Sequence, residues 1–93
     1  ALIRAEAVEA AAPVNFLRTA LALAPAVSGV ERLGPYPAPM ERRAGRYRAQ
    51  IMLQAYDRAP LQNLLRQWLP RIQSLPQARK VRWSIDVDPT ETL

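Results

Sequence analysis

Pro35, Pro37 and Pro39 occupy alternate positions, and this spacing constrains the fold more than any other feature of the chain. In an extended chain, residues two apart direct their N–H positions to the same side, so these prolines remove hydrogen-bond donors from one edge only. A strand of this kind suits the edge of a sheet, because no further strand can pair with it on that side. A polyproline-like loop fits the same residues equally well. Residues 30–40 are therefore expected to form either an edge strand or such a loop.

Residues 46–55 alternate regularly between apolar and polar side chains, which predicts a half-buried strand. A polar turn over Glu41–Gly45 would join this strand to the proline-containing segment as a β-hairpin. The expected buried face consists of Tyr47, Ala49, Ile51, Leu53 and Ala55. The opposite face would carry Arg46, Arg48, Gln50, Met52 and Gln54.

Two segments have the apolar spacing of an amphipathic helix. Pro13 suits a first helical turn and Pro25 disfavours helix before it, so a helix is expected over Pro13–Leu23. A second helix would begin after Asp57, a suitable N-cap residue, and Pro70 is expected to kink or divide it. The apolar positions are Val14, Leu17, Leu21 and Ala24 in the first helix, and Leu61, Leu64, Leu65, Trp68, Leu69 and Ile72 in the second.

Two further strands complete the expected fold. Residues 2–6 suit a short buried strand, and residues 80–87 alternate between apolar and polar side chains. The resulting order is β-α-β-β-α-β, the ferredoxin-like split-βαβ pattern of an α+β domain. Right-handed crossovers place both helices on one sheet face and give the strand order 4-1-3-2, in which the second strand is an edge. The expected core is Ile3, Leu17, Leu21, Ile51, Leu53, Leu61, Leu65, Trp68, Val81, Trp83 and Ile85.

The length of 93 residues fits a single domain over residues 1–93 with one modest core. Hydrophobic residues make up 49% of the chain and charged residues 23%, which indicates a folded domain. No apolar run approaches the roughly 20 residues that a membrane span needs. The chain contains no cysteine and no histidine. Disulfides, thiolate metal sites and Ser-His or Cys-His catalysis by these residues alone are therefore excluded.

Positive charge is concentrated in residues 42–83, which carry ten basic side chains and one acidic side chain. Guanidinium groups fork onto phosphate oxygens and are weakly hydrated, so the pattern favours a nucleic-acid partner over a merely solvated surface. The open sheet face is expected to show Arg46, Arg48, Gln50, Lys80 and Arg82. Phosphate contacts are expected from Arg42, Arg43, Arg46, Arg48, Lys80 and Arg82, and a sugar or base-edge contact from Gln50.

Three other functions receive less support from the residues. An RNA-recognition module shares this topology, but it carries aromatic side chains on the open face of its first strand, where this chain has none. Asp86 and Asp88 share a strand face, but no third ligand accompanies them, so no metal site is expected. The three glycines are not clustered as they are in a phosphate-binding loop, so no catalytic site of the chain's own is expected.

Three segments carry a resemblance to a known family. They are Leu33–Pro35, Gly45–Gln50 and Arg79–Pro89, and Ala1–Glu6 resembles the join to a preceding helicase core. Together they resemble the C-terminal domain of the primosomal protein N′ (PriA) family of bacterial replication-restart helicases. The resemblance spans essentially the whole chain. The family often has an aromatic residue where this chain has Ala49.

This resemblance implies a non-catalytic C-terminal DNA-binding domain with a ribosomal-protein-like fold, excised from a larger helicase. The start at Ala1, without a methionine, agrees with that expectation. The implied role is recognition of branched DNA at stalled or abandoned replication forks, and primosome assembly. The implied parent is an ATP-dependent 3′→5′ DNA helicase that uses ATP with Mg²⁺ and a structural zinc, and that acts in the bacterial cytoplasm at the nucleoid. The fragment itself is expected to need no cofactor and to contact no membrane.

An alternative function follows from the same resemblance. The domain would brace the helicase core and bind the acidic tail of the single-stranded-DNA-binding protein. Arg58, just before the second helix, matches a position associated with that tail, although it also fits an ordinary exposed arginine. An acidic peptide and a phosphate backbone both favour a basic surface, so charge alone leaves the two functions open.

Overall fold

The computed structural model describes residues 1–43 and 45–86, and for residues 39–43 only the main chain. Its strands are β1 (Leu2–Ala7), β2 (Val30–Arg43), β3 (Arg46–Ala55) and β4 (Arg82–Asp86). Its α-helices are α1 (Ala12–Ala22), between β1 and β2, and α2 (Arg58–Gln73), after β3, and a short 3₁₀ helix over Pro76–Arg79 precedes β4. This order confirms the predicted β-α-β-β-α-β pattern of an α+β domain.

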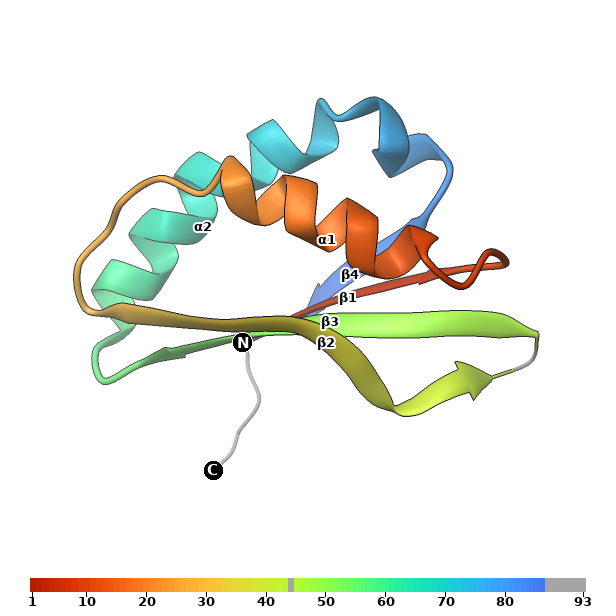
Figure 1. Cartoon of the computed structure of the whole chain (residues 1–93). Helices are drawn as coiled ribbons and strands as arrows, with labels where there is room; N and C mark the ends of the chain where they lie inside the picture. The colour runs from red at the N-terminus through yellow and green to blue at the C-terminus, as the bar shows by residue number, and fades with distance from the viewer. Residues whose placement is uncertain (44, 87–93) are drawn as a thin grey trace.

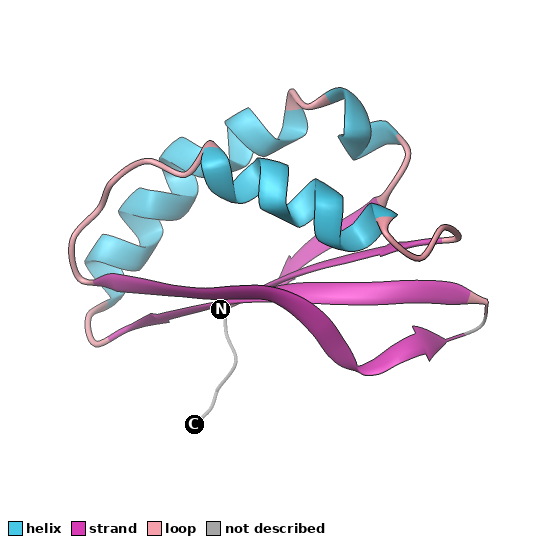
Figure 2. Ribbon diagram, viewed as in Figure 1, coloured by secondary structure: helices cyan, strands magenta, loops and turns pink. Residues whose placement is uncertain are grey.

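The four strands form one antiparallel sheet in the order β2-β3-β1-β4. Read from the other side this is the predicted order 4-1-3-2, so that prediction is confirmed. Both helices cover one face of the sheet (Figure 1). Figure 2 shows the same two layers by secondary structure, with the magenta sheet lying under the cyan helices. The other face of the sheet, opposite the helices, is called the open face below.

The alternating prolines lie in a strand and not in a polyproline loop. β2 is an edge of the sheet and pairs with β3 alone, so its prolines need no partner on the outer side. Its register against β3 shifts twice, between Leu33 and Tyr36 and between Pro37 and Arg42. Such irregularities bend a strand, and β2 curves away from the sheet along its second half (Figure 1). The edge-strand alternative is therefore confirmed.

The core lies between the sheet and the two helices. Ile3, Ile51 and Leu53 supply its sheet side, and Leu17 and Trp68 supply its helix side. All predicted core residues are buried or packed against the core, including the half-buried Leu21, Leu61, Trp83 and Ile85. The Trp68 indole Nε1–H donates a 2.8 Å hydrogen bond to the Ala20 carbonyl, which ties α2 to α1.

The predicted apolar stripe of α1 faces the core but is not its most buried part. Val14 and Leu21 of α1, and Ala24 just after it, are partly buried and pack against the core, whereas the buried residues of α1 are Pro13, Phe16, Leu17 and Ala20. Phe16 contacts Trp83 on the sheet, with ring centroids 6.2 Å apart, and the Ala20 carbonyl accepts the Trp68 hydrogen bond. These two tertiary contacts bury residues that the predicted stripe left out.

Two expectations about α2 are met only in part. Asp57 occupies the N-cap position with extended backbone, but its side chain makes no capping hydrogen bond. Pro70 does not divide the helix, which runs without interruption from Arg58 to Gln73. Pro70 and Arg66 are both exposed, so the Arg66 carbonyl that loses its usual donor can be hydrated.

Replacing Pro70 with alanine is expected to stabilise the domain by about 1–2 kcal/mol, because alanine restores the donor and removes the helix penalty of proline. The gain is smaller than the full helix penalty of proline, because alanine also raises the conformational entropy of the unfolded chain. Urea unfolding followed by circular dichroism measures it. Pro60→Ala is the matched control, because proline is tolerated in a first helical turn and a change below about 0.5 kcal/mol is expected there. Equal effects of the two substitutions would contradict this explanation.

Candidate nucleic-acid interface

The open face carries the polar side chains of β1 and β3 in register with those of β4. Glu6 of β1 lies opposite Arg48 of β3 on one side and Arg82 of β4 on the other. Arg4 of β1 lies opposite Gln50 and Ser84 in the same way. Antiparallel partners point to the same face, so these residues form two rows across the sheet.

Three arginines converge on the carboxylate of Glu6. Its Oε1 lies 3.9 Å from the Arg46 Nε and 3.7 Å from an Arg82 Nη, and its Oε2 lies 4.0 Å from the Arg48 Nε. We call these four residues the Glu6 cluster. All three distances exceed hydrogen-bond length, so the contacts are charge–charge contacts without the fork geometry of a tight pair.

The Glu6 cluster is partly open to solvent and has more positive than negative charge. The side chains of Arg46, Arg48 and Arg82 are 37%, 21% and 70% exposed, and that of Glu6 is 29% exposed. Three cations against one anion leave a positive excess within the cluster, which lies toward the hairpin end of the open face. The structure thus brings together three of the predicted phosphate-contacting arginines.

Gln50 lies on the open face but is only 7% exposed. Its amide Nε2 donates a 3.3 Å hydrogen bond to the Tyr36 hydroxyl. The Tyr36 ring comes close to Gly34, at which an added Cβ would lie 3.0 Å from the ring and 2.9 Å from the Gln50 carbonyl oxygen. Gln50 therefore positions Tyr36 in this structure, and a contact with a sugar or base edge remains a prediction.

The other predicted residues lie apart from the Glu6 cluster or only beside it. Arg42 and Arg43 end β2, where their main chain pairs with Tyr47 and Arg46, which places them beside β3 at the hairpin end. Asp88 lies outside the described residues. Arg58 is exposed and is the first residue of α2. It follows the far end of β3, about 30 Å from Arg46 at the usual rise per strand residue.

The prediction that Lys80 lies on the open face was wrong. The main chain is still turning at this point, since the N–H groups of Lys80 and Val81 both donate to the Gln77 carbonyl, at 2.9 and 3.2 Å. β4 and its alternation begin only at Arg82. Lys80 instead borders a hollow beside the start of α1, together with Glu9, Asn15 and Phe16.

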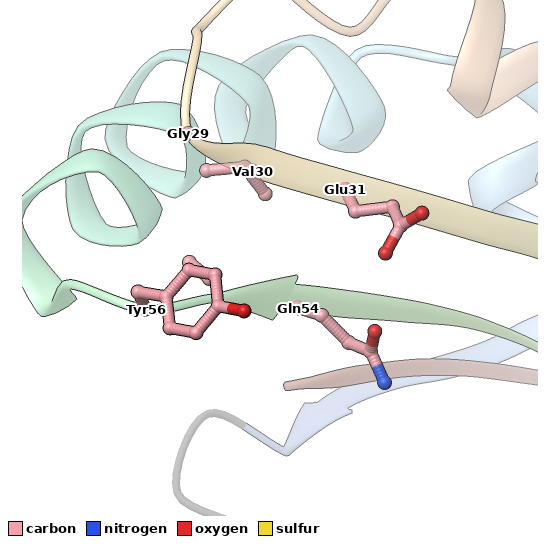
Figure 3. A pocket seen from close by; sticks show the side chains of 6 residues that line it. Gly29, Val30, Glu31, Gln54 and Tyr56 are labelled. Carbon is pink, nitrogen blue, oxygen red and sulfur yellow. The ribbon is translucent and has the colours of Figure 1, made fainter.

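A second hollow, of about 640 Å³, lies at the end of β2 and β3 away from the Glu6 cluster. Figure 3 shows the Tyr56 ring and the side chains of Glu31 and Gln54 bordering it. Tyr56 is fully exposed, and Glu31 is the one charged residue of the described lining. The described lining of this hollow has no cation to receive a phosphate, so these residues do not extend the basic surface.

The described residues do not fit a metal site. Within residues 1–43 and 45–86, no three acidic, cysteine or histidine side chains gather as metal ligands would. The helices of the same residues include none long and apolar enough to cross a membrane.

Sequence reasoning missed Glu6, Arg4 and Tyr36 as members of the open face. Leu2, Arg4 and Glu6 alternate with the buried Ile3, Ala5 and Ala7, so period-two alternation was present in β1. The alternation was overlooked because the segment is short and begins with two apolar residues, so it was interpreted as a fully buried strand. No local signal places Tyr36 opposite Gln50, because that pairing depends on the register shift in β2.

Comparison with known proteins identifies a family and a relative that this chain resembles. The family model described as "Primosomal protein N C-terminal domain" matches residues 1–90. The chain is 40% identical over 65 residues to the replication restart protein PriA of Haemophilus influenzae. That match covers 70% of this chain and 9% of that protein, so the chain spans a small part of the relative's length.

Proposed function

Because the chain belongs to the family of primosomal protein N C-terminal domains, we propose that it is a non-catalytic DNA-binding domain of a replication-restart helicase of the PriA type. It would contribute to recognising branched DNA at stalled or abandoned forks and to assembling the primosome. The ATP- and magnesium-dependent strand separation, in the 3′→5′ direction, and the structural zinc would belong to the rest of the parent. The place of action would be the bacterial cytoplasm, at the nucleoid.

The observation that carries this proposal is the convergence of Arg46, Arg48 and Arg82 on a sheet face that no described helix covers. Arginine is the residue best suited to phosphate contacts, and the three side chains come from strands of one rigid sheet. Arg42 and Arg43 would add contacts from the hairpin end, whereas Lys80, which borders the hollow beside α1, is not included in this interface. Binding would be insensitive to base sequence, because phosphate contacts carry no sequence information. Preference for a branch would come from two duplex arms meeting one rigid basic surface.

The test is fluorescence anisotropy of the 93-residue chain with a forked DNA, a linear duplex and a single strand over a salt series. Tighter binding to the fork, weakened by salt, is the expected result. Absence of binding to all three DNAs would overturn the proposal and leave the docking function as the better account.

Removing two arginines of the Glu6 cluster gives the sharper measurement. Arg46→Ala combined with Arg48→Ala is expected to flatten the slope of log affinity against log salt by about 1.8 units, at about 0.9 for each lost phosphate contact. Arg18→Ala with Arg66→Ala is the matched control, because it removes the same charge from exposed positions on α1 and α2. A slope unchanged in the first variant, or changed equally in the control, would remove Arg46 and Arg48 from the interface.

The docking alternative has one observation in its favour, the position of Arg58. This exposed arginine lies about 30 Å from Arg46 along β3, so a peptide could engage it without covering the Glu6 cluster. The domain would then brace the helicase core and receive the acidic tail of single-stranded-DNA-binding protein. Titration of a fluorescent acidic-tail peptide, without DNA, into wild type and Arg58→Ala tests this. Equal affinities, or no binding, would exclude Arg58 from the role.

A further inference from the structure

We propose that Glu6 limits the affinity of the open face for nucleic acid, because it occupies the arginines that a phosphate would use. This inference rests on the proposed DNA-binding function and assigns a role within it to a residue outside the set predicted to bind DNA. Glu6 would not contact the DNA itself. It acts by holding Arg46, Arg48 and Arg82, so it is a positioning residue that lowers the affinity for DNA.

The position of Glu6 in the sheet makes it a shared counterion. β1 lies between β3 and β4, and at the level of Glu6 it has Arg48 on one side and Arg82 on the other. Arg46 reaches the same carboxylate from one further row along β3. A carboxylate and a phosphodiester each carry one negative charge and accept hydrogen bonds from guanidinium groups, so the two compete for the same donors.

The contacts within the Glu6 cluster are of the kind that contributes little to folding. All three ion pairs are 3.7–4.0 Å long and involve partly exposed side chains. Ion pairs of this type have small effects on stability, because solvent screens them and ordering the side chains costs entropy. Glu6 can therefore be changed without unfolding the domain, and its main effect is on the electrostatic potential that an approaching phosphate meets.

The sign of the effect follows from the charges. A phosphate bound to these arginines would lie within several ångströms of the Glu6 carboxylate and would be repelled by it. Neutralising Glu6 with the isosteric Glu6→Gln substitution is expected to tighten DNA binding about threefold to tenfold at low salt, the size of a unit-charge effect at that distance in a largely aqueous medium. The salt dependence should also become steeper, because more phosphate contacts would then replace counterions.

The experiment measures binding of a fluorescent linear duplex to the 93-residue chain over a salt series. Glu9→Gln is the matched control, since Glu9 is exposed, carries the same charge and lies in the hollow that Lys80 borders, away from the Glu6 cluster. Glu6→Asp keeps the charge and is expected to bind about as wild type does. Thermal unfolding of each variant shows that folding is retained.

A double-mutant cycle distinguishes action through the arginines from a general change in charge. Once Arg46, Arg48 and Arg82 are all alanine, Glu6→Gln is expected to change affinity by less than about twofold. A folded Glu6→Gln variant that binds as wild type or more weakly, or a gain that persists without these arginines, would overturn this inference while leaving the DNA-binding function intact. Failure of wild type to bind DNA at any salt would overturn both.

Discussion

Replacing Trp68 with alanine is expected to remove about 3–5 kcal/mol of folding free energy, the usual loss for a fully buried tryptophan. Trp68 is completely buried between α2 and α1. A domain of this size has a total stability on the order of 5–14 kcal/mol, so this single change removes a large share of it. Urea unfolding followed by circular dichroism measures the loss.

Trp68→Phe separates the contribution of the buried ring from that of the Nε1–H hydrogen bond. It keeps most of the buried area but removes the Nε1–H donor, and a loss of about 1–2 kcal/mol is expected. The Ala20 carbonyl is not left without a partner, because it also accepts from the Leu23 N–H at 3.0 Å. If Trp68→Ala cost less than about 1 kcal/mol, the packing of α2 on α1 described above would be wrong.

Replacing Gly34 with alanine is expected to destabilise the domain by about 2–4 kcal/mol, because backbone strain and a steric clash coincide there. Gly34 has a φ of +114°, a conformation that residues with a side chain rarely adopt. An added Cβ would also lie 2.9 Å from the Gln50 carbonyl oxygen and 3.0 Å from the Tyr36 ring. Neither the β3 backbone nor the ring can move without disturbing the β2–β3 pairing.

Gly45→Ala separates these two causes. Gly45 also has a positive φ, +77°, but no atom of the described residues lies within 4 Å of an added Cβ. Its substitution should cost about 1–2 kcal/mol from backbone strain alone. Thermal or urea unfolding of both variants measures the difference. Equal losses would show that the close approach at Gly34 contributes nothing.

The fold was largely predictable because its signals are local. The change between period-two and helical spacing marked β3, β4 and the two helices, and a short apolar run marked β1. The three prolines were consistent with an edge strand. The exceptions share a cause. The most buried part of α1 depends on Phe16 and Ala20 meeting Trp83 and Trp68, residues that are distant in the sequence. The continuity of α2 through Pro70 depends on which side of the helix faces solvent.

The candidate site was predictable only in part. Alternation in β3 was enough to place Arg46 and Arg48 on the open face, and alternation in the last strand placed Arg82 there. Lys80 was misplaced because a 3₁₀ turn delays the start of β4. The burial of Gln50 was not foreseen, because the irregular register of β2 brings Tyr36 opposite it.

By itself, the sequence determined the element order and the face on which the arginines of β3 lie, because each depends on residue types at fixed spacing within one segment. Whether residues 30–40 form an edge strand or a loop was left open, and pairing with β3 decided it. The tertiary structure decided that Glu6 is the common partner of Arg46, Arg48 and Arg82. That arrangement requires β1 to pair in register with both β3 and β4, so residues 6, 48 and 82 meet through contacts that no local spacing encodes. The balance between attraction of phosphate and competition by a carboxylate is therefore a property of the assembled sheet.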